Sequence, residues 1–281
     1  MKLLHLSSYI KSFVFLTIFL PLLAQSQPEY RITPDVIYGH KAGMALTYDV
    51  FQPVDSANGA GIIHIVSGSW NSRYQVPDSV VTNYKPLLDE GFTVFALRHG
   101  SNPQFTIPQA VEDVMLGSWE VYRNAAKFGV DSARLGIFGG SSGGQLALMA
   151  GLSGKTHPVS AVVAFFAPAD LRNMPDFLKA MIPALDFDTT LADSVSPVTF
   201  ASPDDPPTLL IHGDNDFVVQ LWQSERMYEA LQQYQVISRL IIYKGMGHGN
   251  SYGAKGKYYE EATRELIMWF KQYLLNEKRI E

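Results

Sequence analysis

Apolar and polar residues alternate along the chain with two different periods. Short runs of strand-forming residues predict β-strands at 44–51, 61–67, 92–98, 159–166, 208–212 and 237–243. Between these runs, apolar residues recur at the spacing of one helix face and predict helices at 79–90, 106–128, 221–234 and 258–275. The alternation predicts the α/β class, with a mostly parallel central sheet covered by helices on both faces.

The stretch 168–207 interrupts this regular pattern. It contains seven of the sixteen prolines of the chain. An irregular stretch of that length inside a domain is usually functional or an insertion. We therefore interpret it as a small partial cap over a site, within a single domain that spans residues 27–281.

The first 26 residues have the organisation of a secretory signal peptide. Lys2 and Lys11 flank a polar start, and 12–24 is an apolar run too short to span a bilayer comfortably. Ala24 and Ser26 supply the small residues of a cleavage site. We expect residues 1–26 to be removed and the mature chain to be secreted or periplasmic, without a stable membrane span. The alternative is an uncleaved anchor helix.

The composition is that of one folded domain. Hydrophobic residues make up 47% and charged residues 17% of the 281 positions, which is enough for one large core. The net charge of −5 disfavours nucleic acid as a partner. Because the chain has no cysteine, no disulfide forms, and an exported protein of this sequence relies on its core for stability.

A strand, a sharp turn and a helix are predicted around 134–147, where glycines surround two serines. This arrangement is typical of a nucleophile elbow, in which a strained turn exposes the serine hydroxyl above the sheet. The doubled glycines allow either Ser141 or Ser142 to be the nucleophile. The apolar run ends at Phe138 and favours Ser141. A glycine-rich turn without chemistry is the alternative.

A serine nucleophile needs a general base and an acid that orients it. Two acid candidates, Asp214 and Asp216, follow the apolar run 208–212, at a strand end where α/β sheets place their sites. Either could instead be a turn aspartate. A calcium loop is disfavoured because the glycine and the glutamate that such a loop requires are missing.

His248 is the candidate base. It lies in a glycine-rich loop after the last predicted strand, where an exposed loop histidine is the alternative role. We interpret His64 as a strand residue and His212 as a structural residue at a strand end. Together, the order Ser, Asp, His along the chain is that of α/β-hydrolases.

The stretches 139–147, 211–219 and 247–249 together resemble an α/β-hydrolase, nearest to the hormone-sensitive-lipase-like and carbohydrate-esterase branches. They are similar to the G-x-S-A-G-G-x-L-A elbow, the H-G-x-x-D-x-V-V motif and the late G-H-G of those branches. The resemblance implies that the nucleophile is Ser141 and the acid is Asp216. Three motifs in order are far more specific than any one of them.

The oxyanion loop departs from the pattern of those branches. Their H-G-G-G-W motif corresponds to 66–70 here, which keeps Gly68 and Trp70 but lacks the histidine and two glycines. We expect an oxyanion hole formed by the N–H of Ser142 and by the Ser67–Gly68 region.

These features predict an exported serine esterase with Ser141, Asp216 and His248 as its triad. The resemblance and the expected export suggest acetyl or feruloyl esters on polysaccharides, or a small-molecule ester. Position alone makes Trp70, Arg98 and His99 candidates for the substrate pocket. No cofactor and no metal is implied.

Two other functions compete with this hypothesis. A serine peptidase similar to the catalytic part of prolyl oligopeptidases would share the triad, although we see no room for the accompanying propeller. A catalytically inactive binding module would explain the altered oxyanion loop, but it has no reason to keep three triad members in order.

Overall fold

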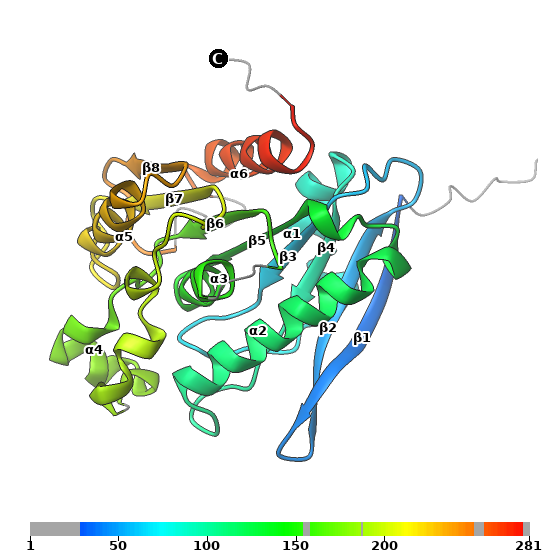
Figure 1. Ribbon diagram of the computed structural model, residues 1–281. Helices are drawn as coiled ribbons and strands as arrows, with labels where there is room; N and C mark the ends of the chain where they lie inside the picture. Colours follow the sequence, from blue (N-terminus) through cyan, green and yellow to red (C-terminus); the bar gives the residue numbers. More distant parts are fainter. Residues whose placement is uncertain (1–28, 154–157, 187, 250–255, 278–281) are drawn as a thin grey trace, which may run out of the picture.

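One sheet of eight strands organises the computed structural model, which describes residues 29–153, 158–186, 188–249 and 256–277 (Figure 1). The spatial order is β1-β2-β4-β3-β5-β6-β7-β8. β1 pairs with β2, and β2 with β4, in antiparallel fashion, and all other neighbours are parallel. The strands are β1 (Tyr30–Lys41), β2 (Met44–Pro53), β3 (Gly61–Ile65), β4 (Thr93–Leu97), β5 (Leu135–Gly140), β6 (Ala161–Phe165), β7 (Thr208–Gly213) and β8 (Ser238–Tyr243).

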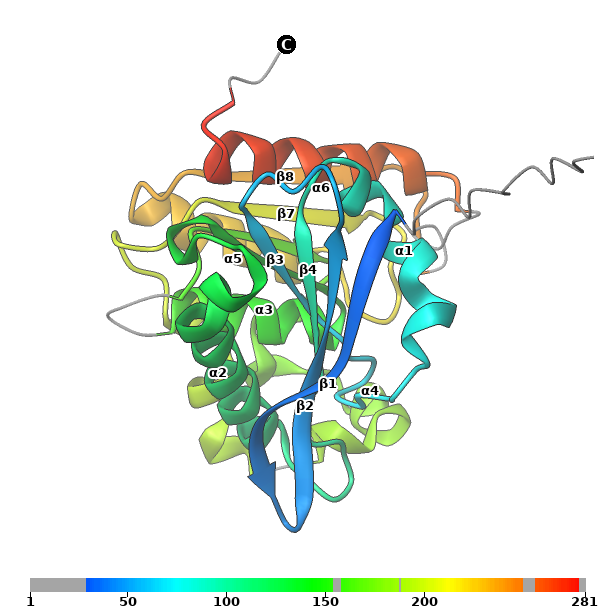
Figure 2. The same ribbon diagram turned by 90° about the vertical axis from the view of Figure 1, so that its right-hand side faces the viewer.

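Helices cover both faces of this sheet. α1 (Pro77–Asp89) and α6 (Tyr259–Leu274) lie on one face, and α2 (Ile107–Asn124), α3 (Ser142–Leu152) and α5 (Trp222–Gln233) lie on the other. Figure 2 shows α1 and α2 on opposite sides of the strands, with the β1–β2 hairpin at one edge. The predicted fold class is confirmed.

The strands carry side chains into two separate cores because neighbouring residues point to opposite faces. Ile63, Phe95 and Ile137 pack under α2 and α3, whereas Ile62 and Val94 pack under α1 and α6. A parallel strand buried on both faces has no polar side to alternate with. This is why the central strands show as continuous apolar runs in the sequence.

The predicted strands and helices are present within a few residues of their expected ends, but β1 was not predicted. It is an edge strand with Pro34 in its middle, and its pairing with β2 shifts register between Thr33 and Val36 and again between Ile37 and Gly39. Proline and such irregularities are tolerated at an edge, and they obscure the two-residue period in the sequence.

The stretch 168–207 forms short helical turns and the short helix α4 (Asp176–Met181). It is fastened to the main helices by Gln145, whose Nε2 donates to Val195 O at 2.8 Å, and by Gln223, whose Oε1 accepts from the N–H of Ala169 and Asp170 at 2.7 Å. The stretch therefore packs beside α3 and α5.

The signal peptide predicted at 1–26 lies outside the described residues, so its removal stays a prediction. Among the helices of the described ranges, none combines the length and the apolar character needed to cross a bilayer.

Candidate active site

The turn between β5 and α3 holds Ser141 in a strained backbone conformation. Its φ of 53° and ψ of −125° belong to a region that residues other than glycine rarely adopt. The neighbouring glycines make the turn possible, since a Cβ on Gly139 would lie 2.3 Å from Gly143 O. Ser142 is instead the first residue of α3 and is buried. Ser141 is therefore the residue at the apex of the elbow.

Ser141, His248 and Asp216 meet at the carboxyl ends of β5, β8 and β7. The Oγ of Ser141 lies 2.9 Å from His248 Nε2, and His248 Nδ1 lies 2.8 Å from Asp216 Oδ2. Three residues from distant parts of the chain thus form one continuous hydrogen-bonded series. This geometry lets the imidazole accept the serine proton while the carboxylate orients the ring.

The carboxylate of Asp216 is held from both sides. Its Oδ1 accepts the N–H groups of Val218 and Val219, each at 2.9 Å. Burial by itself raises the pKa of Asp216, but the hydrogen bonds from His212 and His248 and the charge of His248 outweigh it and hold this pKa well below its usual range. Asp216 therefore stays ionised, and it fixes the proton of His248 on Nδ1.

The neighbouring residues His212 and Asp214 have structural roles. His212 is fully buried, with Nε2 at 2.8 Å from Val219 O and Nδ1 at 2.7 Å from Ser224 Oγ. Asp214 Oδ1 accepts the N–H of Gly245 at 2.5 Å, which pins the loop that carries His248. Of the two aspartates, only Asp216 bonds to His248 in the described part of the chain.

Ser141 and His248 open into a hollow of about 660 Å³. Its wall is formed mainly by the segment after β3, through Ser67, Gly68, Asn71, Arg73 and Gln75. None of the described residues that line this hollow belongs to 168–207. The interpretation of that stretch as a cap over the site is therefore wrong, because its anchors to Gln145 and Gln223 hold it beside the site.

The expected oxyanion hole is only partly available. The N–H of Gly68 donates to Asn71 O at 2.9 Å, within a small antiparallel bridge, so the prediction that Gly68 serves the oxyanion is wrong. No described residue accepts a hydrogen bond from the N–H of Ser67 or of Ser142. These two groups remain as the candidate donors.

Trp70 does not line the hollow at Ser141, contrary to its predicted place in the pocket. It is 3% exposed, and its Nε1–H donates to Gln145 Oε1 at 2.9 Å. Ser69 and Trp70 have φ values of 52° and 54°, and this local twist turns the indole inward against α3. The indole therefore fastens the loop to the helix.

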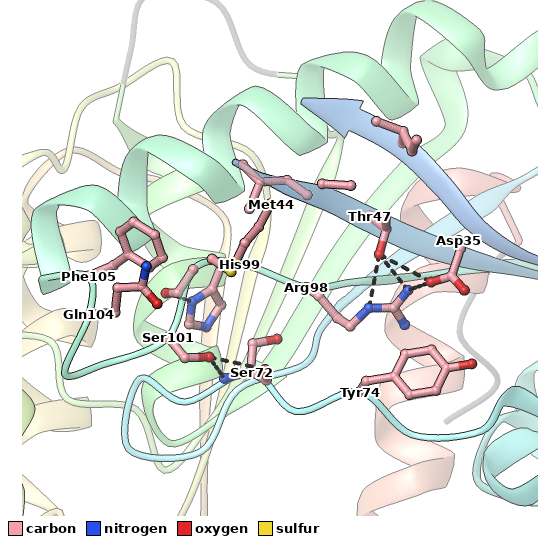
Figure 3. Close-up of a pocket in the computed structure, with 14 residues that line it drawn as sticks. Asp35, Met44, Thr47, Ser72, Tyr74, Arg98, His99, Ser101, Gln104 and Phe105 are labelled. Carbon is pink, nitrogen blue, oxygen red and sulfur yellow. Dashed lines mark hydrogen bonds and ion pairs between the residues drawn. The ribbon is translucent and has the colours of Figure 1, made fainter. Parts of the chain in front are cut away.

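Arg98 and His99 line a second hollow of about 570 Å³ rather than the one at Ser141 (Figure 3). The extended segment after Asn71 separates the two, since Arg73 faces the first hollow and Ser72 and Tyr74 face the second. The placement of Arg98 and His99 in the pocket around the nucleophile is accordingly wrong.

The guanidinium of Arg98 is fully engaged inside the protein. It pairs with the buried Asp49 and with Asp35 at 2.8 Å, and it donates to Thr47 Oγ1 at 2.7 Å. Figure 3 shows the guanidinium of Arg98 between Thr47 and Asp35 on one side and the ring of Tyr74 on the other. With its donors used in this way, Arg98 acts as a structural cation.

A smaller apolar recess of about 240 Å³ adjoins the hollow at Ser141 and was not anticipated. Both cavities are lined by His64, Gly140 and Phe166, and the recess extends under α1 and α6 past Phe138 and Leu266. In the sequence, the recess was indicated only by His64, the polar residue within the apolar run 61–65.

His64 is a polar residue that lines both this recess and the hollow at Ser141. Its Nδ1 lies 2.9 Å from the hydroxyl of Tyr84, and its ring stacks on Phe138 with 4.5 Å between centroids. Burial lowers the pKa of His64 to about 4, so the ring is neutral near pH 7.

No group of three or more His, Cys, Asp or Glu that could hold a metal ion is found among the described residues.

Comparisons with known proteins agree with this fold. A family model described as BD-FAE matches residues 48–231. Esterase LipQ of Mycobacterium tuberculosis is 25% identical over 223 residues, which cover 71% of this chain and 52% of that protein. The chain thus spans about half the length of the curated relatives it matches.

Two solved structures are similar over most of the chain. A truncated carbohydrate esterase from gut microbiota is 26% identical with a TM-score of 0.69, covering 86% of this chain and 96% of that one. Esterase 2 of Thermogutta terrifontis phosphorylated by paraoxon is 19% identical with a TM-score of 0.71, covering 87% and 94%. These matches confirm the α/β-hydrolase fold.

Proposed function

The chain belongs to the BD-FAE family, and on that premise we propose that it is a serine esterase that hydrolyses carboxylic esters through an acyl-enzyme. The observation that carries the proposal is the unbroken hydrogen-bonded series from Ser141 Oγ through His248 to Asp216. The strained backbone at Ser141 supports it, because such strain is concentrated at functional sites.

Acylation begins when Ser141 Oγ attacks the ester carbonyl and its proton passes to His248 Nε2. Asp216, ionised and buried, stabilises the imidazolium that forms. The N–H groups of Ser142 and Ser67 stabilise the negative charge on the carbonyl oxygen. His248 then gives the proton to the departing alcohol, which leaves the acyl group on Ser141.

Deacylation repeats these steps with water. His248 accepts a proton from a water molecule, the resulting hydroxide attacks the acyl carbonyl, and the proton returns to Ser141 Oγ as the carboxylic acid leaves. The hollow that Ser141 and His248 both line gives this water a path to the acyl group. His248 therefore carries every proton that moves in the two halves of the reaction.

The substrate we propose is an acetyl or feruloyl ester on a polysaccharide. The carbohydrate esterase among the similar structures is matched by this chain over nearly its whole length, which supports a carbohydrate ester. The apolar recess beside Ser141 supports an acyl group larger than acetyl, because it offers ring-sized space among Phe138, Phe166 and Leu266.

We further propose that the chain is exported, on the basis of the signal-like segment 1–26. N-terminal sequencing of the protein recovered from the producing cells tests this point. A mature chain that starts at Gln27 is expected, and retention of the first 26 residues would contradict it.

The activity is tested by incubating the protein with p-nitrophenyl acetate, methyl ferulate and acetylated xylan. A peptide p-nitroanilide in the same panel tests the serine peptidase alternative. We expect hydrolysis of the esters, none of the anilide, and loss of activity in Ser141→Ala. Turnover of the anilide alone would favour the peptidase, and inertness toward every substrate would favour the binding module.

A further inference from the structure

Three side chains form a second hydrogen-bonded series directly behind the candidate oxyanion loop. The Oγ of Ser142 lies 2.9 Å from Ser67 Oγ, and Ser67 Oγ lies 2.9 Å from His99 Nε2. The other ring nitrogen, His99 Nδ1, lies 2.8 Å from Gly100 O. The series links three separate segments: the first turn of α3, the loop after β3 and the residues after β4.

The direction of these hydrogen bonds follows from the carbonyl at one end. Because Gly100 O can only accept, His99 Nδ1 carries a proton. Burial of His99 lowers its pKa, so the ring is neutral and Nε2 is an acceptor. Ser67 therefore donates to His99, and its own oxygen is left to accept from the hydroxyl of Ser142. All polar atoms of the series are satisfied in this one arrangement.

The last two residues of the series, Ser67 and Ser142, are those whose N–H groups are the candidate oxyanion donors. The loop comes very close to the helix here, since a Cβ on Gly143 would lie 2.8 Å from Ile65 O and 3.5 Å from Ser67 O. The loop also needs holding, because Ser69 and Trp70 have positive φ values that cost on the order of 1–3 kcal/mol each.

We propose that His99 is a positioning residue for ester hydrolysis: through Ser67 it holds the oxyanion loop against the N-terminus of α3, so that the N–H groups of Ser67 and Ser142 converge on one oxygen. The proposal rests on the esterase function proposed above. His99 is 4% exposed and lines the second hollow, so it acts from behind the loop without touching the substrate.

This role predicts an effect on kcat rather than on KM. A misplaced donor loses contact with the oxyanion of the transition state, whereas the planar ester of the ground state depends little on it. Removal of one oxyanion donor typically costs about 10²–10³ in kcat, and a loosened donor costs less. We expect His99→Leu to lower kcat about 10–100-fold with KM changed less than about threefold.

The test compares His99→Leu, His99→Gln, Ser67→Ala and the double variant Ser67→Ala/His99→Leu on p-nitrophenyl acetate. Active sites are counted by the p-nitrophenol burst or by paraoxon titration, so that kcat refers to folded enzyme only. His99→Gln keeps an acceptor at the position of Nε2 and should restore most of kcat. The double variant should lose no more than His99→Leu alone, because both changes cut the same series. His40→Leu, at an exposed histidine of β1, is the matched control and should match the unmodified protein.

Each outcome bears on one of the two proposals. Unchanged kcat per titrated site in His99→Leu, or multiplied losses in the double variant, would overturn the positioning role while leaving the esterase intact. A lower melting temperature with fewer titratable sites but normal kcat would show a purely structural role and would also overturn it. If His99→Leu does not fold, kcat of Ser67→Ala, which only deletes a hydroxyl, tests the same hydrogen-bonded series. An inert unmodified protein would remove the esterase proposal and this inference with it.

Discussion

Replacing Asp216 by asparagine changes one atom of the site and forces a defined rearrangement of protons. The Oδ1 of Asp216 accepts two backbone N–H groups, from Val218 and Val219. The amide oxygen of the introduced side chain must stay there, because an NH₂ group in that place would face two donors. The NH₂ group is therefore directed at His248 Nδ1.

The consequence for catalysis follows from the tautomer of His248. An NH₂ neighbour donates to Nδ1, so the ring proton moves to Nε2, the atom that lies 2.9 Å from Ser141 Oγ. A protonated Nε2 cannot accept the serine proton. In a serine protease the same change lowers kcat about 10⁴-fold, which corresponds to about 5.5 kcal/mol. We expect a loss of that order here, with little change in KM.

The measurement is the steady-state hydrolysis of p-nitrophenyl acetate by Asp216→Asn. The matched control is Asp214→Asn in the same loop, whose amide oxygen can keep the bond from Gly245 N–H. The control should retain kcat within about threefold, since Asp214 does not contact His248. If Asp216→Asn keeps more than about a tenth of the activity, or if both variants lose activity equally, Asp216 does not set the tautomer of His248.

Three further predictions concern the residues around the site. Arg98→Met leaves the carboxylate of Asp49, which is 2% exposed, without its cation. The free energy of unfolding, measured in urea, should fall by about 3–5 kcal/mol, while kcat per titrated site stays the same. A change below about 1 kcal/mol would contradict the structural role of Arg98. Trp70→Phe leaves Gln145 Oε1 without the indole donor, so the free energy of unfolding should fall by about 1–3 kcal/mol while KM is unchanged. A raised KM would show that Trp70 contacts the substrate after all. The pKa of His64 falls from 6.5 to about 4 on folding, so stability should decline as the pH falls from 6.5 toward 4, by at most about 3 kcal/mol from this residue. Urea unfolding of His64→Gln between about pH 4.5 and pH 7.5 should show a shallower decline, and an identical slope would refute the assignment.

Much of the fold was predictable because local signals and tertiary structure agree. Strands buried on both faces must be apolar throughout, so β3, β4, β6 and β7 are visible as runs in the sequence. These visible runs are the reason why the fold class could be predicted correctly. β1 was missed because an edge strand needs neither a continuous run nor a strict alternation.

The triad was accessible to sequence reasoning because each member lies shortly after a strand, and parallel strands bring their carboxyl ends to one edge. The strain at Ser141 also has a sequence signal, since Gly139 leaves room that no other residue would. The structure brings the three predicted residues together, and their catalytic roles remain proposals.

The wrong predictions for Gly68 and Trp70 concern the direction in which a group points, which motif spacing does not encode. The N–H of Gly68 turns to Asn71 because of a bridge inside the loop after β3, and Trp70 turns inward because of two positive φ angles. A motif fixes where a residue lies in the chain, whereas these directions depend on contacts with α3 such as Gln145 Oε1. Likewise, prolines marked 168–207 as irregular but did not indicate where it packs.

If Ser141 is the nucleophile of a serine hydrolase, an organophosphate must bind covalently to its hydroxyl. The unmodified protein, Ser141→Ala and Ser142→Ala are treated with paraoxon, and the intact masses and tryptic peptides are measured. We predict one diethylphosphoryl group per chain, located on Ser141, retained in Ser142→Ala and lost in Ser141→Ala. A label on Ser142, or no label on a folded unmodified protein, would show that Ser141 is not the nucleophile.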